Sequence, residues 1–182
     1  GVRTQQGVFH ADQVLVAAGT GTETLLSGLQ IKLPMLHRPA LVITTQRADL
    51  KLRHVLATDF GEVRQLPTGA LMTPASIGHQ GDSSEDLADH PEVAADKAMA
   101  RLRALFPKAM LGLATSQLAH RPIPQDGFPA VGEVAPGLYA ATMHSGITLG
   151  ALMGELIGRE MLHGVSNETA RWLAPYRPSR FA

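Results

Sequence analysis

One stretch near the C-terminus, GITLGALMGELIG, restricts the fold more than any other part of the sequence. Glycine recurs in it every four residues, at Gly146, Gly150, Gly154 and Gly158. This spacing places all of them on one side of a helix, where each glycine costs up to about 1 kcal/mol relative to alanine. We therefore expect a helix over 146–163, with a sheet, another helix or a flat ligand packed very close to its backbone.

The start of this helix is a candidate binding element. It is formed by Ser145, Gly146, Ile147 and Thr148, directly after His144. The first turn of a helix has N–H groups without intrahelical partners and carries the positive end of the helix dipole. These features suit a phosphate, or a carbonyl oxygen that becomes anionic. Close helix–sheet packing alone is the alternative explanation of the glycines, and a packed, hydrogen-bonded imidazole is the alternative for His144.

Arg121 lies in the stretch HRPIPQDGFPAVG, which contains three prolines and two glycines and cannot form a helix. Because Arg121 precedes a proline, its backbone is restricted to an extended conformation. A guanidinium held there can bind a carboxylate through two parallel, charge-assisted hydrogen bonds. The alternative is a surface salt bridge from Arg121 to Asp126, at the corner of the turn PQDGFP.

The order of the expected elements predicts an α+β protein. A strand buried on both faces, QVLVAAG, precedes a short helix, TETLLSGL. A long strand over 33–46 and short strands up to residue 76 are antiparallel in character, and a polar loop follows over 78–89. Proline punctuation and an apolar face predict a helix over 91–106. The strands MLGLATSQLAH and GLYAATM then lead to the long C-terminal helix.

We expect 1–30 and 121–164 to form parts of an α/β layer, 31–120 to form an inserted cap, and 165–182 to be an extended tail. The chain begins with Gly1 rather than methionine and opens directly on strand-like residues. We therefore expect the start of the protein to lie elsewhere, a processed chain or a cloning remnant being the alternative.

Composition excludes some classes of function. Lysine plus arginine equal aspartate plus glutamate at 16 each, which argues against a general nucleic-acid or anionic-membrane surface. Cysteine is absent, so there is neither a disulfide nor a thiolate metal site, and we expect a cytoplasmic location. No apolar run is long enough to span a bilayer. The stretch AAGTGTETLL has Thr24 where the dinucleotide fingerprint requires glycine, and no P-loop or zinc spacing occurs.

Two stretches resemble the FAD-dependent D-amino-acid oxidase superfamily, most closely its glycine oxidase and sarcosine oxidase branch. One is RPIPQDGFPAVGEVAPGLYAATMHSGITLGALMGELIGREM, where the family typically has R-P-x-x-x-D-G-x-P-x-x-G and then a strand-to-helix step GLYxAxGHxxxG. The other is ADQVLVAAGTGTETLLSGLQIKLPMLHRPALVITT, which is similar to the family's strand ending in AAG and the strand after it. The resemblance covers nearly the whole chain, but the family's N-terminal dinucleotide-binding fold is absent.

The resemblance implies FAD as cofactor and an amine or amino acid as substrate, oxidised by hydride transfer to the flavin. By the resemblance, Arg121 holds the substrate carboxylate, and Gly19 lies near the pyrophosphate or ribose of FAD. The turn His144, Ser145, Gly146, Ile147 and Thr148 would face the pyrimidine edge of the flavin. The fold implied is a partial FAD/NAD(P)-binding α/β layer with an antiparallel substrate-binding cap. The implied partner is an N-terminal FAD-binding portion, in the same protein or in a partner chain.

The sequence departs from the family at three places. Thr20-Gly21 replace the residues that usually follow AAG, Met143 replaces the glycine before His144, and ITTQ replaces the family's rGq after the long strand. The departures at Thr20-Gly21 and Met143 favour one alternative, a flavin-free, non-catalytic subunit that contacts a partner chain. A further alternative is a flavoenzyme that acts on an alcohol or a 2-hydroxy acid, since Arg121 would bind any carboxylate.

Overall fold

The computed structural model describes residues 1–75, 87 and 89–182. Within these ranges the chain divides into two compact units. Unit 1 comprises Gly1–Leu36 and Arg121–Ala182, and unit 2 comprises His37–His120. Most of the polar loop expected over 78–89 lies outside the described residues.

Unit 1 is built around a small mixed sheet in the order β11-β12-β3. β11 and β12 form an antiparallel hairpin, and β12 pairs in parallel with β3. A second pairing joins two very short strands, β4 and β10, and the hairpin β1–β2 stands by itself. The bounds are β1 Val2–Thr4, β2 Gly7–Phe9, β3 Val14–Val16, α1 Thr22–Ser27, β4 Met35–Leu36, β10 Ile123–Pro124, β11 Ala130–Ala135, β12 Leu138–Thr142, α3 Gly146–His163 and α4 Asn167–Leu173.

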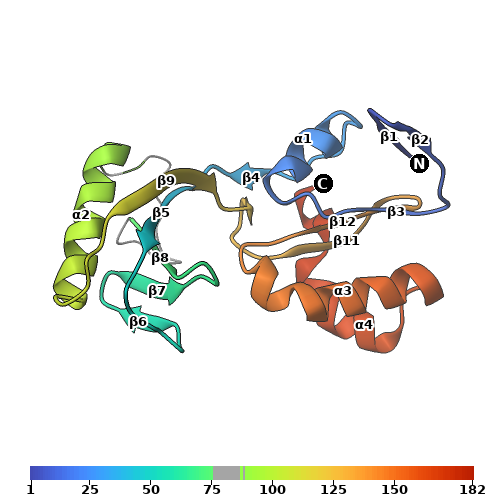
Figure 1. The fold of residues 1–182 in the computed structure, drawn as a ribbon. Coiled ribbons are helices and arrows are strands. Elements are labelled where there is room, and N and C mark those ends of the chain that lie inside the picture. Colours follow the sequence, from blue (N-terminus) through green and yellow to red (C-terminus); the bar gives the residue numbers. More distant parts are fainter. Residues whose placement is uncertain (76–86, 88) are drawn as a thin grey trace. The chain divides into compact units, whose positions relative to one another are not determined.

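Helices cover both faces of the β11-β12-β3 sheet, as Figure 1 shows. Adjacent residues of a strand point to opposite faces. Accordingly, Val131 packs with Leu156 and Ile157 of α3, whereas Ala130 packs with Leu26 of α1. The α/β layer of unit 1 is therefore a three-layer arrangement with apolar contacts on each side of the sheet.

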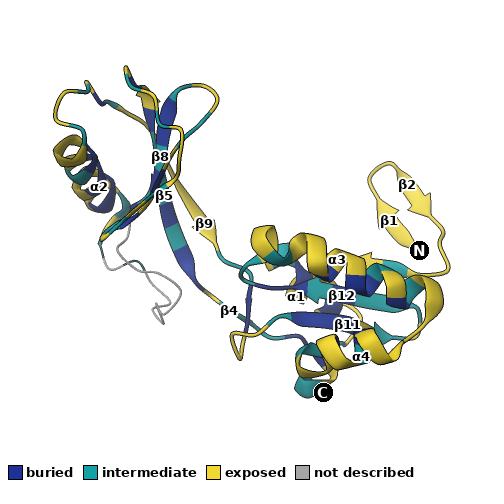
Figure 2. Ribbon diagram, turned by 90° about the horizontal axis from the view of Figure 1, so that it is seen from below, coloured by how far each residue is buried: buried dark blue, intermediate teal, exposed yellow. Residues whose placement is uncertain are grey.

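Unit 2 is a five-stranded antiparallel sheet in the order β6-β7-β8-β5-β9, covered by α2 on one face. Its core consists of alternate residues of the strands and one side of α2, including Ile43, Leu71 and Leu102. Figure 2 shows this inner side of α2 as buried. The bounds are β5 Pro39–Arg47, β6 Leu56–Thr58, β7 Gly61–Gln65, β8 Ala70–Pro74, α2 Pro91–Leu105 and β9 Leu113–His120.

The α+β class predicted from the sequence is confirmed, but two of the expected elements differ. The strand expected to be buried on both faces corresponds to β3, which is partly exposed. Its central residue Leu15 is 37% exposed, because β3 lies at the edge of the described sheet and pairs only with β12. The tail expected to be extended over 165–182 is helical, with α4 and then short 3-10 helices at Ala174–Tyr176 and Pro178–Phe181. Ser166 and Thr169 cap each other's backbone at the start of α4, which initiates the helix there.

None of the helices among the described residues is both long enough and apolar enough to cross a membrane.

Candidate functional site

Arg121 is the first residue of the second segment of unit 1, directly before β10. Its side chain is partly buried, and its Nε atom is shielded from solvent. The following residue, Pro122, contacts the turn after β3, since a Cβ built on Gly19 would lie 3.9 Å from the Cβ of Pro122. The loop that carries Arg121 is thus packed against the turn that carries Gly19.

Gly19 opens the turn between β3 and α1 with a φ of +57°, a left-handed conformation that favours glycine. Its carbonyl accepts a hydrogen bond from the hydroxyl of Thr142, the last residue of β12, at 3.5 Å. The hydroxyl of Thr22, at the other end of the turn, is fully buried and has no hydrogen-bond partner within the described part of the chain. The turn therefore lies beside the end of β12 and contains one buried polar atom that remains unsatisfied.

His144 follows Thr142 by two residues and leads into α3. Its Nδ1 lies 3.4 Å from the hydroxyl of Ser145. Burial lowers the pKa of His144, and the positive charge of Arg121 lowers it further. The guanidinium of Arg121 therefore lies close enough to the imidazole for its charge to act on it. The lowered pKa keeps His144 neutral at pH 7.

The N-terminus of α3 is open. Among the described residues no side chain caps it, and its first turn contains no acidic residue. Gly146, Ile147 and Thr148 are all exposed, and the side chain of Ile147 is as accessible as in an extended peptide (103%). The N–H of Gly146 donates to the carbonyl of His144 at 2.9 Å. The rest of the first turn and the positive dipole end of α3 face solvent and are available to a bound group.

The structure thus brings together the parts that the sequence singled out: Gly19, Arg121, and the turn from His144 to Thr148. The alternative expectation, a salt bridge from Arg121 to Asp126, is wrong. Asp126 is held instead by Arg180, whose Nε and Nη2 donate to its two carboxylate oxygens at 2.6 and 3.0 Å. Sequence reasoning missed Thr142, Thr22 and Arg180. A polar residue at the end of a buried strand could have indicated Thr142, but nothing in the local sequence points to the other two.

The glycine stripe of α3 does not contact the sheet. The buried residues of α3 are Met153, Leu156, Ile157 and Glu160, a face of the helix that is rotated from the glycine stripe by roughly a quarter of a turn. No described atom lies within 4 Å of the positions that a Cβ would occupy at Gly150, Gly154 or Gly158. Close helix–sheet packing within this chain therefore does not explain the stripe.

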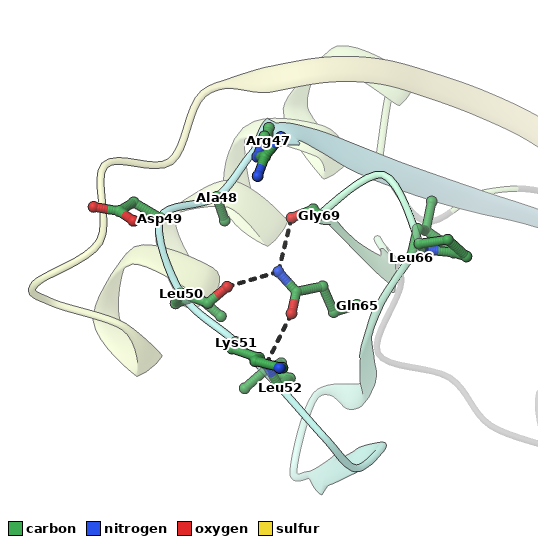
Figure 3. Close-up of a pocket in the computed structure, with 10 residues that line it drawn as sticks. Arg47, Ala48, Asp49, Leu50, Lys51, Leu52, Gln65, Leu66 and Gly69 are labelled. Atoms are coloured by element: carbon green, nitrogen blue, oxygen red, sulfur yellow. Dashed lines mark hydrogen bonds between the residues drawn. The ribbon is translucent and has the colours of Figure 1, made fainter.

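Unit 2 contains an open groove of about 920 Å³ between the end of β5 and the β7–β8 turn (Figure 3). The side chain of Gln65 connects the backbone segments that line this groove. Its amide oxygen accepts from the backbone N–H of Leu52 at 2.8 Å, and its amide nitrogen donates to the carbonyls of Leu50 and Gly69 at 2.8 and 2.9 Å. Because these hydrogen bonds link two loops to each other, we interpret Gln65 as a structural element of unit 2.

Comparison with known proteins identifies the family. Residues 1–160 match the family model described as FAD dependent oxidoreductase. The chain is similar in structure to glycine oxidase from Geobacillus kaustophilus, with a TM-score of 0.73 and 21% identity, over 99% of this chain and 48% of that one. An L-amino acid deaminase from Proteus vulgaris, with its specific insertion sequence deleted, gives a TM-score of 0.72 and 23% identity, over 99% and 45%.

L-proline dehydrogenase from P. horikoshii gives a TM-score of 0.69 and 17% identity, over 100% of this chain and 50% of that one. The comparison with curated proteins found no match. The chain thus spans about half the length of the solved structures that it resembles. At these identities the structural likeness shows the fold alone, whereas the family model matches most of the sequence. The chain belongs to the family of FAD-dependent oxidoreductases.

Proposed function

We propose that this chain is the C-terminal portion of an enzyme that oxidises an amino acid or a secondary amine bearing a carboxylate, with FAD as the acceptor. The observation that supports this most strongly is the proximity of two positive features in unit 1. The charge of Arg121 acts on His144, and His144 directly precedes the open N-terminus of α3. One feature suits a carboxylate and the other suits an oxygen that gains negative charge.

Arg121 would hold the substrate carboxylate. Its guanidinium presents parallel N–H groups that match the two oxygens of a carboxylate. Partial burial reduces competition from water, so that the charge-assisted hydrogen bonds count for more than on an open surface. Because the lowered pKa disfavours the charged form of His144, the imidazole does not add a second positive charge beside Arg121 at neutral pH.

The residues around Gly19 and α3 fit FAD. An unsatisfied buried hydroxyl at Thr22, a glycine with positive φ at position 19 and an uncapped helix N-terminus are the kinds of groups that a nucleotide cofactor engages. Gly19 would lie beside the pyrophosphate or ribose, and His144, Ser145, Gly146, Ile147 and Thr148 would face the flavin ring. Bound FAD would accept the hydride that leaves the substrate carbon next to nitrogen, and water would hydrolyse the resulting imine.

The open surfaces of unit 1 support a partner. Gly146, Gly150 and Gly154 of α3 are exposed, and the free edge of β3 borders a sheet with only three strands among the described residues. Four helical glycines are unfavourable unless something approaches the backbone closely, and parallel sheets are normally covered and extended on both sides. We propose that an N-terminal FAD-binding portion, in the same protein or in a partner chain, occupies these surfaces. Unit 2 would serve as the substrate-binding cap.

A test of this function uses the FAD-loaded enzyme that contains this chain. Under anaerobic conditions, a panel of amino acids, secondary-amine acids and 2-hydroxy acids is added while the flavin absorbance is recorded. We expect bleaching by at least one amine with a free carboxylate and much slower bleaching by its methyl ester. This chain alone is expected to purify without stoichiometric FAD.

Three results would contradict the proposal. Bleaching only by 2-hydroxy acids would assign the enzyme to that substrate class, and equal rates for acid and ester would remove the carboxylate from recognition. A partner complex that contains this chain but retains no FAD would favour the flavin-free, non-catalytic subunit.

A further inference from the structure

The C-terminal segment carries two arginines that anchor it to different elements of unit 1. Arg177 donates from Nη1 and Nη2 to the two carboxylate oxygens of Glu160 in α3, at 2.7 and 2.5 Å. Three residues later, Arg180 donates from Nε and Nη2 to the two carboxylate oxygens of Asp126. Its Nη2 also donates to the carbonyl of Phe128 at 3.1 Å. The segment therefore ties α3 to the turn that follows Arg121.

The turn over 124–128 is fixed on several sides. The N–H of Gln125 donates to the carbonyl of Pro34 at 2.9 Å, and the N–H of Gly127 donates to the carbonyl of Pro124 at 2.8 Å. Asp126 itself accepts from the N–H of Phe128 at 3.1 Å. The hydrogen bonds from Arg180 lower the pKa of Asp126, so its carboxylate is ionised at neutral pH. Within the described part of the chain, the guanidinium of Arg180 ties this turn to the C-terminal segment through paired hydrogen bonds.

The short path from Asp126 to Arg121 is stiff. It contains Pro122 and Pro124, whose rings fix φ, and its middle residues form β10, paired with β4. The pairing with β4 restrains the middle of this path, but the two prolines leave few backbone torsions that could absorb a shift of the turn, so we expect part of such a shift to reach Arg121.

We propose that Arg180 is a positioning residue: by holding Asp126 it sets the place of Arg121 relative to the N-terminus of α3. The expected effect of Arg180 on catalysis rests on the proposed function. Its expected effect on the position of Arg121 does not. The side chains of Arg180 and Asp126 are 22% and 35% exposed, and their ion pair is bidentate, so it contributes to stability as well as to the position of the turn. The experiment below separates these two effects.

The first arm of the experiment uses this chain and His144 as a reporter, because the charge of Arg121 lowers the pKa of His144. Histidine pKa values are measured by NMR titration, and the variant His144→Gln assigns the signal among the eight histidines. We expect Arg180→Gln to raise the pKa of His144 part of the way to the value in Arg121→Leu, and Arg180→Lys to raise it less. Arg159→Lys, which alters the exposed pairing of Arg159 with Glu155 of α3 and Glu168 of α4, is the matched control and should leave the pKa of His144 unchanged.

The second arm measures kinetics of the FAD-loaded enzyme. Arg180→Gln should raise KM for the carboxylate substrate about tenfold with kcat nearly unchanged, since a small displacement of a binding group weakens binding strongly. KM of Arg180→Lys for the carboxylate substrate should lie between those of Arg180→Gln and the unaltered enzyme. KM for the methyl ester should not change in either variant.

A wild-type pKa of His144 in folded Arg180→Gln, as judged by circular dichroism, would overturn the inference. So would a fall in melting temperature with no change in KM or in the pKa of His144, which would reduce Arg180 to a structural contact. If the unaltered enzyme oxidises no amine at all, the proposed function fails, while the NMR arm still decides whether Arg180 positions Arg121.

Discussion

Replacing Arg121 by leucine in the FAD-loaded enzyme is expected to lower kcat/KM for the carboxylate substrate about 100-fold. Two charge-assisted hydrogen bonds to a carboxylate are worth about 3 kcal/mol together, and each 1.4 kcal/mol corresponds to about a tenfold change. Nearly all of the loss should appear in KM, because the guanidinium binds a group that does not change during the reaction. The affinity for FAD should change little. Steady-state kinetics and flavin titration measure the two quantities.

Two further variants make this result specific. Arg121→Lys keeps the positive charge but cannot form the two parallel hydrogen bonds. Its kcat/KM should therefore lie between those of Arg121→Leu and the unaltered enzyme. Arg171→Leu removes an exposed arginine of α4 and should leave the kinetics unchanged. Kinetics of Arg121→Leu that equal those of the unaltered enzyme would remove Arg121 from the substrate site, whatever its position in the structure.

Replacing Glu160 by glutamine is expected to destabilise this chain by about 3 kcal/mol, the lower end of the range for breaking a buried ion pair. The side chain of Glu160 is only 2% exposed, and that of Arg177 is 24% exposed. The variant would therefore leave the charge of Arg177 largely buried without its partner. Urea unfolding of the chain measures the effect. Glu155→Gln changes an exposed pair on the same helix and should lower the free energy of unfolding by less than about 1 kcal/mol. Equal losses of stability in the two variants would contradict the role of the Glu160–Arg177 pair as a buried ion pair.

The same pair predicts a pH dependence. Hydrogen bonds from Arg177 lower the pKa of Glu160 in the folded chain below the ordinary value of 4.5. A group whose pKa is lowered by folding stabilises the folded state above its unfolded pKa, and this contribution is lost as the pH falls through the folded-state pKa. The free energy of unfolding of the unaltered chain should therefore fall below about pH 4.5, and Glu160→Gln should show a smaller fall over the same range.

The sequence predicted the helices better than it predicted the edges of the fold, and the roles of the candidate site residues stay predictions. The helix over 146–163 begins and ends as expected, because its glycine start and apolar periodicity are local features. The proximity of Gly19, Arg121 and His144 followed from the family resemblance, since these residues are more than 20 positions apart in the sequence and no local pattern links them.

The errors come from interactions between distant segments. The tail after residue 165 was predicted to be extended because of its prolines, yet the reciprocal cap at Ser166 and Thr169 begins a helix before the prolines are reached. Asp126 was considered as a partner of Arg121, which is close in sequence, but it pairs with Arg180, 54 residues later. The apolar run of β3 predicted burial on both faces, whereas β3 lies at the edge of the described three-stranded sheet and Leu15 is partly exposed.

The most direct test of the account is a titration of the FAD-loaded enzyme with propionate, followed by the visible absorbance of the flavin. If Arg121 and the N-terminus of α3 face one site, a simple carboxylate bound to the guanidinium should perturb the ring and give a saturable spectral change. Arg121→Leu should abolish this change, and Arg171→Leu should leave it intact. Propionate that competes with substrate without altering the flavin spectrum, or an unchanged titration in Arg121→Leu, would contradict the claim that the two features serve one site.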